Sequence, residues 1–236
     1  MSGSPHVQII GPGRAGLSLQ QALTSVGWTA SDPWARDEIG RPSPSTDIVV
    51  IATPDAEVAS VAGQVPKGDY AVLHMSGALT LKPLGGHARR GSIHPLVALP
   101  SPQIGSVRLL AGGWFAVAGD DSAQHIAEAL GGSALHVSDD KRVAYHAAAV
   151  IAANHLVALL GQVERIADHA GVAFEPFIDL ARASLDDVAA IGPEAALTGP
   201  AARGDQTTID AHLAALDPSE HDAYRALAAL AGRLVT

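Results

Sequence analysis

The stretch Gly11-Pro12-Gly13-Arg14-Ala15-Gly16 decides how the first half of the chain is interpreted. It lies between an apolar run at residues 7–10 and a run with helical spacing at residues 17–26. A Gly-x-Gly-x-x-Gly turn between a strand and a helix is typical of dinucleotide-binding folds. We expect Gly11 to permit the turn, Gly13 to let the backbone touch a pyrophosphate, and Gly16 to let helix and strand pack closely. The alternative is a turn that binds nothing, because a chain with 24 glycines also meets the pattern by chance.

The composition narrows the class of protein. The chain has 236 residues, 47% of them hydrophobic, which is enough for one large or two modest packed domains. It contains no cysteine, so disulfides and thiolate zinc sites are excluded, and the spacing of its histidines predicts no metal site. The net charge of −9, with no basic run, argues against nucleic acid as a partner. We see no signal peptide and no membrane-length apolar run, and therefore expect a cytoplasmic protein that does not bind membranes.

Strands and helices alternate over residues 1–139, which predicts an N-terminal α/β Rossmann domain with a doubly wound, mainly parallel sheet. Helices are expected at residues 14–26, 56–63 and 122–130. Strands are expected at residues 6–10, 28–31, 47–52, 70–75, 91–94, 114–118 and 133–137. Thr53 and Pro54 follow the third strand at its carboxyl end, where open α/β sheets bind ligands. We assign these two residues, together with residues 11–16, to the cofactor site.

The residue that contacts the adenosine ribose is expected near the end of the second strand. Asp32 would bind the free 2′-hydroxyl of NAD, whereas Arg36 would accommodate the 2′-phosphate of NADP. Pro33 ends the strand and Arg36 has a long reach, so we favour Arg36 and NADP, with NAD as the alternative. Residues 36–46 are few and rich in proline, so we expect the helix and strand of a full mononucleotide-binding half to be missing or vestigial there.

Residues 140–236 are rich in alanine and leucine with helical spacing, which predicts an all-α C-terminal domain. The longest helix is expected at residues 143–170. Shorter ones are expected at residues 175–191, 194–197, 207–216 and 219–234. Because the long helix is apolar on most sides, it needs to be covered by other helices or subunits, and we predict a homodimer.

Four polar residues are candidates for catalysis. His146 and Asn154 lie eight residues apart on the long helix and point roughly to one side, where His146 would give a proton to a carbonyl or imine and Asn154 would orient the substrate. Ser76 and His94 follow two strands on the ligand side of the sheet and would line the same cleft. The alternatives are a core histidine, simple turns, and Lys141 as the acid.

Arg203 and Asp205 are candidates for binding the substrate. They lie in a segment, residues 197–208, that is rich in turn-forming residues and ends where a helix begins. The guanidinium of Arg203 offers two parallel donors to a substrate carboxylate. The alternative is a polar loop between helices, with Thr207 or Thr208 as the cap of the next helix.

Several of these stretches resemble the Rossmann-like oxidoreductases with a C-terminal domain of previously unknown function. That group is related to ketopantoate reductase, pyrroline-5-carboxylate reductase and the 6-phosphogluconate dehydrogenase-like proteins. The resemblance covers nearly the whole chain and rests on residues 11–16, 76–77, 93–96, 145–156 and 197–205. It implies NADP-dependent reduction of a small oxo or imino acid, in a site between the glycine turn and a helical 6-phosphogluconate dehydrogenase-like domain.

The resemblance also identifies a departure on the long helix. Ketopantoate reductases carry a catalytic lysine there, with asparagines four and eight positions later; aligned on Asn154, these positions hold His146 and Val150 in this chain. We therefore expect a reductase for a small-molecule substrate, with ketopantoate as the first one to test. The alternative is a non-catalytic nucleotide-sensing protein that keeps the fold, which the missing lysine and the short segment after Arg36 favour.

Overall fold

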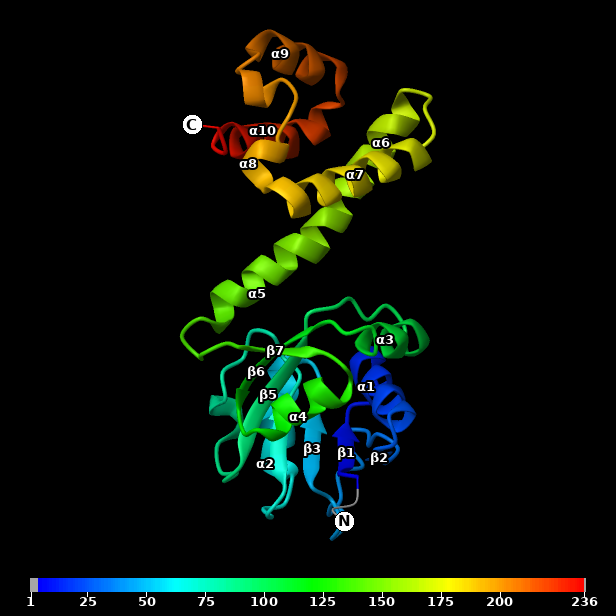
Figure 1. Ribbon diagram of the computed structural model, residues 1–236, viewed down its shortest axis with the longest axis vertical. Helices are drawn as coiled ribbons and strands as arrows, with labels where there is room; N and C mark the ends of the chain where they lie inside the picture. The colour runs from blue at the N-terminus through cyan, green and yellow to red at the C-terminus, as the bar shows by residue number, and fades with distance from the viewer. Residues whose placement is uncertain (1–3, 236) are drawn as a thin grey trace. The chain divides into compact units, whose positions relative to one another are not determined.

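A computed structural model describes residues 4–235 and divides the chain into two compact units, Met1–Ala153 and Asn154–Thr236. The first unit contains the whole sheet and the first part of the long helix (Figure 1). The domain boundary predicted after residue 139 lies just before this helix begins at Arg142, and it stays a prediction.

A seven-stranded sheet forms the centre of the first unit and confirms the predicted fold class. Its order is β2-β1-β3-β4-β5-β6-β7, with every neighbouring pair parallel except β5 and β6. The chain therefore changes direction across the sheet between β1 and β3, and open α/β sheets bind their ligands at such a switch point. The strands are β1 (His6–Ile10), β2 (Thr29–Ala30), β3 (Ile48–Ile51), β4 (Ala71–His74), β5 (Arg90–Pro95), β6 (Trp114–Gly119) and β7 (Ser133–His136).

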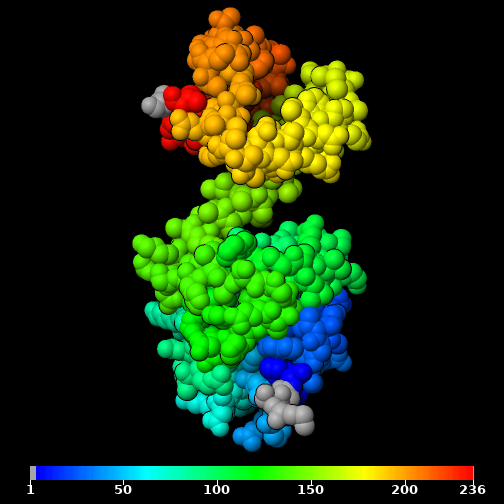
Figure 2. All heavy atoms as spheres, in the orientation of Figure 1, coloured from blue at the N-terminus to red at the C-terminus, as the bar shows by residue number. Residues whose placement is uncertain are grey.

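Helices cover both faces of the sheet, because the central strands are apolar on both sides. On one face pack α1 (Arg14–Ser25), α3 (Pro102–Leu109) and α4 (Ser122–Ala129). On the other lies α2 (Val58–Gln64), preceded by a 3-10 turn, Asp55–Glu57, and joined by the 3-10 turn Lys82–Leu84. The segment from β6 to β7, coloured green, forms much of the visible surface of this unit in Figure 2.

The structure contains α3, which the sequence pattern did not predict. Ser101 caps this helix by accepting a hydrogen bond from the Ile104 amide, and Pro102 occupies its first position. Ile104 and Val107 are exposed, so the helix shows no clear apolar stripe. The sequence of α3 therefore lacks the periodic spacing of apolar residues from which a helix is predicted.

The segment between β2 and β3 contains no helix in the described chain, as predicted. Trp34 instead continues the line of β2, since its amide donates to the Ile9 carbonyl and its carbonyl accepts from the Gly11 amide at 2.8 Å. This short connection lies directly beside the glycine turn.

The long helix is interrupted by a π-helical turn. It begins as α5 (Arg142–Val150), passes through the π turn Ile151–His155, and continues as α6 (Leu156–His169). The π turn changes the rotation between residues 146 and 154, so the straight-helix estimate for these positions no longer applies. By length and composition the run Arg142–His169 is apolar enough to cross a membrane, and no part of its most apolar window is buried in the described structure.

The second unit is entirely helical, as predicted, and has little interior of its own. Gln162 and Ala167 are the buried residues among its described positions. The Arg165 guanidinium binds both carboxylate oxygens of Glu220, at 2.6 and 3.0 Å, which fixes α6 to a later turn. Besides α6, its elements are α7 (Glu175–Ile191), α8 (Pro193–Ala196), α9 (Gln206–Ala215), α10 (His221–Gly232) and the 3-10 turns Ala201–Arg203 and Pro218–Glu220.

Candidate functional site

The glycine turn has the backbone geometry that its sequence predicted. Gly11 adopts φ +111°, and a Cβ there would lie 2.7 Å from the Ala52 carbonyl oxygen. A Cβ on Gly16 would lie 2.0 Å from the Gly11 carbonyl oxygen. Both positions exclude any other residue, so the predicted structural roles of Gly11 in the turn and Gly16 in the packing of helix against strand are confirmed.

Gly13 differs from the other two glycines because the fold itself does not require it. Its backbone is ordinary, with φ −80° and ψ −177°, and a Cβ there would meet nothing within 4 Å. It precedes the first turn of α1, whose amides have no side-chain cap. An open space in front of free N–H groups at a helix N-terminus fits a diphosphate, so the turn passes this test for a dinucleotide. Pro12 and Arg14 at the mouth of the turn are exposed, and Ala15 is half-buried.

Arg36 and Asp32 both remain candidates for contacting the adenosine ribose of the cofactor. The Arg36 guanidinium forms an ion pair with Glu57, and both side chains remain accessible to solvent. The Asp32 carboxylate accepts a hydrogen bond from the side-chain Nε2 of Gln20 at 3.3 Å. Thr53, after β3, has a buried hydroxyl with no partner in the described structure. The choice between NADP through Arg36 and NAD through Asp32 stays a prediction.

The predicted catalytic residues of the first unit meet around Gly77. A Cβ on Gly77 would lie 2.6 Å from His146 Cδ2 and 2.9 Å from His94 Cε1 and Nε2, so only glycine leaves room for both imidazoles. The His94 ring stands edge-on to His146 and to Tyr145, with centroids 5.8 and 5.7 Å apart. The Tyr145 hydroxyl lies 2.8 Å from His94 Nδ1. The His94–Tyr145–His146 cluster is thus formed at the carboxyl ends of β4 and β5 by the start of α5.

This cluster lies on the same edge of the sheet as the glycine turn. The strands from β1 to β5 are parallel, so their carboxyl ends share one edge. Three strand spacings separate β1 from β5, which is about 14 Å. The arrangement can therefore hold a dinucleotide at one point and a reacting group at another.

The Ser76 side chain stabilises the loop that follows β4. Its hydroxyl donates to an Asp55 carboxylate oxygen at 2.8 Å and accepts from the amides of Ala78 and Leu79. The Ser76 carbonyl accepts a hydrogen bond from Arg142 Nη2 at 2.9 Å. Asp55 therefore binds Ser76 and does not cap the following helix.

Burial and charge control protonation in the cluster. Burial, followed by the nearby His146 and Arg142, lowers the pKa of His94 to about 4, so this imidazole is neutral at neutral pH. Burial raises the pKa of the Tyr145 hydroxyl, and the positive charge of Arg142 opposes that rise. The tyrosine therefore keeps its proton through the neutral range.

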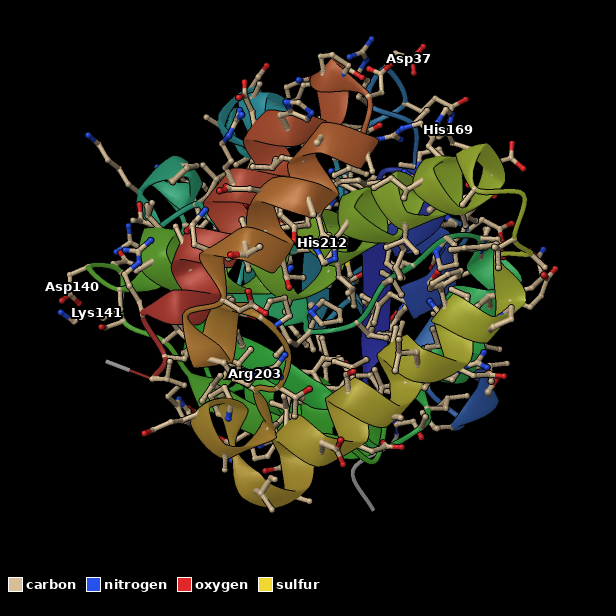
Figure 3. All side chains as sticks on the ribbon, turned by 90° about the horizontal axis from the view of Figure 1, so that it is seen from above. Asp37, Asp140, Lys141, His169, Arg203 and His212 are labelled. Carbon is tan, nitrogen blue, oxygen red and sulfur yellow. The ribbon has the colours of Figure 1, made fainter. Side chains whose placement is uncertain are left out.

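Arg142 is completely buried, and its Nε and Nη1 have no hydrogen-bond partner in the described structure. Nothing in the sequence pattern indicates that Arg142 is buried, because a basic side chain at a helix start is usually solvated. Lys141, the alternative acid, is exposed and pairs with Asp140 at 3.3 Å, and Figure 3 shows both side chains pointing outward. This geometry disfavours Lys141 as a proton donor.

The remaining predicted site residues belong to the second unit. Asn154 lies in the π-helical turn, a feature that often accompanies functional sites. Arg203 is exposed, and Asp205 caps α9 by accepting from the Thr208 amide at 3.0 Å. The cap is thus Asp205 and not Thr207 or Thr208, because its carboxylate also accepts from the Thr208 hydroxyl. The roles of Asn154, Arg203 and Asp205 toward a substrate stay predictions.

Other features of the described residues lie apart from this site. A cavity of about 430 Å³ is lined by Arg41, Lys67 and Arg89 among others, at the amino ends of the strands, which is the opposite edge of the sheet. Among residues 4–235, no group of three histidine or acidic side chains is placed to hold a metal.

Comparisons with known proteins agree with the fold. A family model described as a domain of unknown function, DUF2520, matches residues 114–231, half of the chain. No curated protein matches significantly.

Three solved structures resemble the chain over nearly its whole length. A candidate NADP oxidoreductase from Bacteroides fragilis is 18% identical, with a TM-score of 0.81 over 98% of each chain. An imine reductase from Aspergillus terreus, solved with NADPH4, is 15% identical, with a TM-score of 0.66 over 98% of this chain and 95% of that one. Pyrroline carboxylate reductase from Plasmodium falciparum, solved with NADP, is 12% identical, with a TM-score of 0.62 over 98% of each chain.

Proposed function

The chain belongs to the DUF2520 family, and from its site geometry we propose that it is an NADP-dependent oxidoreductase that reduces a small oxo or imino acid. The observation that carries the proposal is the open space at Gly13 in front of the first turn of α1, on the sheet edge that also holds the His94–Tyr145–His146 cluster. The structural neighbours solved with NADP or NADPH4 support the choice of cofactor. Two of them are reductases of imines or of pyrroline carboxylate, which supports the substrate class.

Each part of the site has a task in such a reaction. Residues 11–16 hold the diphosphate, with Thr53 and Pro54 beside them, and Arg36 binds the 2′-phosphate after leaving Glu57. When bound, NADPH supplies a hydride for the substrate carbon. The cluster around Gly77 supplies the proton, with His146 as the donor predicted from the sequence. Asn154, Arg203 and Asp205 orient the substrate, and Ser76 holds the loop that carries Gly77.

The test combines binding with turnover. NADPH oxidation is measured with ketopantoate, other 2-oxo acids and cyclic imino acids, and NADPH and NADH binding is measured separately by calorimetry. We expect saturable NADPH binding and oxidation with at least one of these substrates. A protein that binds neither nucleotide refutes the proposal.

A nucleotide-sensing protein without catalysis is the second candidate. The feature in its favour is His146, which stands where the resemblance to ketopantoate reductases implies a lysine. It predicts nucleotide binding with no turnover on any carbonyl or imine, and binding that is indifferent to His146→Ala.

We also propose that the protein is a cytoplasmic homodimer. Several large apolar side chains of the helical region are exposed, including Val143, Val157 and Leu180, which are 63% to 71% accessible. Exposed apolar surface of this kind usually marks an interface. Sedimentation without detergent tests this: a dimer at micromolar concentration is expected, whereas a monomer, or a protein that needs detergent to stay in solution, contradicts it.

A further inference from the structure

Resting on the proposed function, we propose that Tyr145 is the residue that gives the proton to the substrate, with His94 and Arg142 stabilising the phenolate that this leaves. The proposal changes the donor predicted from the sequence from His146 to its neighbour. It follows from the hydrogen bond, burial and charge of three residues that lie together in the first unit.

The hydrogen bonding of the cluster singles out Tyr145. Its hydroxyl lies 2.8 Å from His94 Nδ1, and the two rings meet at 85°, so the phenol is held in one orientation. No hydrogen bond fixes the ring of His146 in the part of the chain that the structure describes; it only stands edge-on to His94. A general acid must be positioned to act, and Tyr145 is the better positioned of the two.

His94 is unsuited to be the acid but suited to assist one. Because it is neutral at neutral pH, it has no second ring proton to give. In the tautomer with hydrogen on Nδ1, it can donate that hydrogen bond to the Tyr145 oxygen without losing the proton. His94 is therefore a positioning residue. Its hydrogen bond to the Tyr145 oxygen strengthens as negative charge grows on that oxygen.

Arg142 supplies the positive charge for the same oxygen. It is completely buried, and among the residues that the structure describes its Nε and Nη1 have no hydrogen-bond partner. Its Nη2 donates to the Ser76 carbonyl, but a buried guanidinium with two unpaired nitrogens is unfavourable in the resting protein, and a nearby anion would relieve that cost. The Tyr145 phenolate is such an anion, and the charge of Arg142 already lowers the tyrosine pKa against the effect of burial.

The proposed step balances as follows. As hydride reaches the substrate carbon, the π-electron pair of the C=O or C=N bond moves to the oxygen or nitrogen. That atom forms a bond to the Tyr145 proton, and the electrons of the broken O–H bond remain on the phenol oxygen. His94 Nδ1–H and the charge of Arg142 stabilise this phenolate until a solvent proton restores the phenol.

The chain contains a matched control for the pair. Tyr224 and His212 form a second edge-on pair, with the hydroxyl 2.5 Å from Nδ1 and the centroids 5.8 Å apart, between α10 and α9 of the second unit. Tyr224→Phe therefore removes the same kind of hydrogen bond outside the His94–Tyr145–His146 cluster. Since the chain has three tyrosines, the absorbance change on ionisation can be assigned by difference between variants.

The first measurement uses the protein without nucleotide. Tyrosinate absorbance is followed against pH for the wild type, Tyr145→Phe, Arg142→Met and Arg142→Lys. The titratable or charged groups that act on Tyr145 and its partners include His94, His146, Arg142, Asp139 and Asp55. We expect Tyr145 to titrate above a free tyrosine, and still higher in Arg142→Met but not in Arg142→Lys. A titration unchanged by Arg142→Met overturns the role of Arg142.

The second measurement is turnover with whichever of the 2-oxo or imino acids supports NADPH oxidation by the wild type. Tyr145→Phe is expected to lower kcat by about 100- to 10,000-fold with little change in KM or NADPH affinity, whereas Tyr224→Phe retains kcat. Tyr145→Phe with kcat within threefold of the wild type overturns the inference alone, and a loss confined to His146→Ala returns the role to His146. If the wild type does not oxidise NADPH with any of the tested substrates, the proposed function and this inference are overturned together.

Discussion

Gly13→Ala separates nucleotide binding from folding more cleanly than any other change in the glycine turn. The backbone at Gly13 is ordinary extended chain, and the added methyl would meet no atom within 4 Å. Folding is therefore expected to be unaffected or favoured by about 0.4–1 kcal/mol, because alanine restricts the unfolded chain. For the bound diphosphate the same methyl is a steric intrusion, which costs about 1–3 kcal/mol and weakens NADPH binding by about 5- to 150-fold.

Calorimetric titration with NADPH and thermal unfolding measure the two effects of Gly13→Ala. Gly63→Ala in α2 is the matched control, because that glycine is also exposed and its added methyl also meets nothing within 4 Å. The control should bind NADPH like the wild type. If Gly13→Ala retains full affinity, the turn does not contact the diphosphate; if it unfolds more readily than the wild type, the space in front of the turn is not free.

Three further changes address the cofactor, the cluster and pH. Arg36→Ala is expected to weaken NADPH binding about tenfold and to leave NADH binding unchanged, as measured by calorimetry; equal losses would exclude Arg36 as the reader of the 2′-phosphate. Gly77→Ala places a methyl 2.6 Å from His146 Cδ2, so kcat should fall while NADPH affinity is retained, and unchanged kcat would separate the cluster from the reaction. Because the pKa of His94 is lowered from 6.5 to about 4 on folding, the unfolded chain binds more protons between these pH values, and about 3 kcal/mol of stability is lost as pH falls through this window. Urea unfolding at several pH values should show a smaller loss for His94→Gln, and an identical loss would assign it to other groups.

The sequence predicted the structure best at positions where steric clashes allow only one residue type. At Gly11 and Gly16 a side chain would collide with the backbone, so the motif and the fold determine each other. The apolar run of β3 is buried on both faces of the sheet, which its β-branched pattern indicates directly. These local constraints were sufficient to predict the fold class.

The sequence predicted less where the outcome depends on distant contacts. Arg142 lies beside Lys141, and the pattern does not distinguish the buried side chain from the exposed one. The partner of Tyr145 is His94, which lies 51 residues away, so their contact follows from the arrangement of β5 and α5. The π turn that contains Asn154 likewise cannot be recognised from the spacing of apolar residues in the sequence.

The most direct measurement for the central claim is a titration of the unaltered protein with NADPH, followed by tryptophan fluorescence. Trp34 reports on the site, because its backbone is hydrogen-bonded to Gly11 at 2.8 Å. We predict saturable quenching by NADPH that is reduced in Trp34→Phe and displaced by NADP. Fluorescence that does not change with NADPH or NADH, in a protein that calorimetry also finds unable to bind either one, would contradict the account.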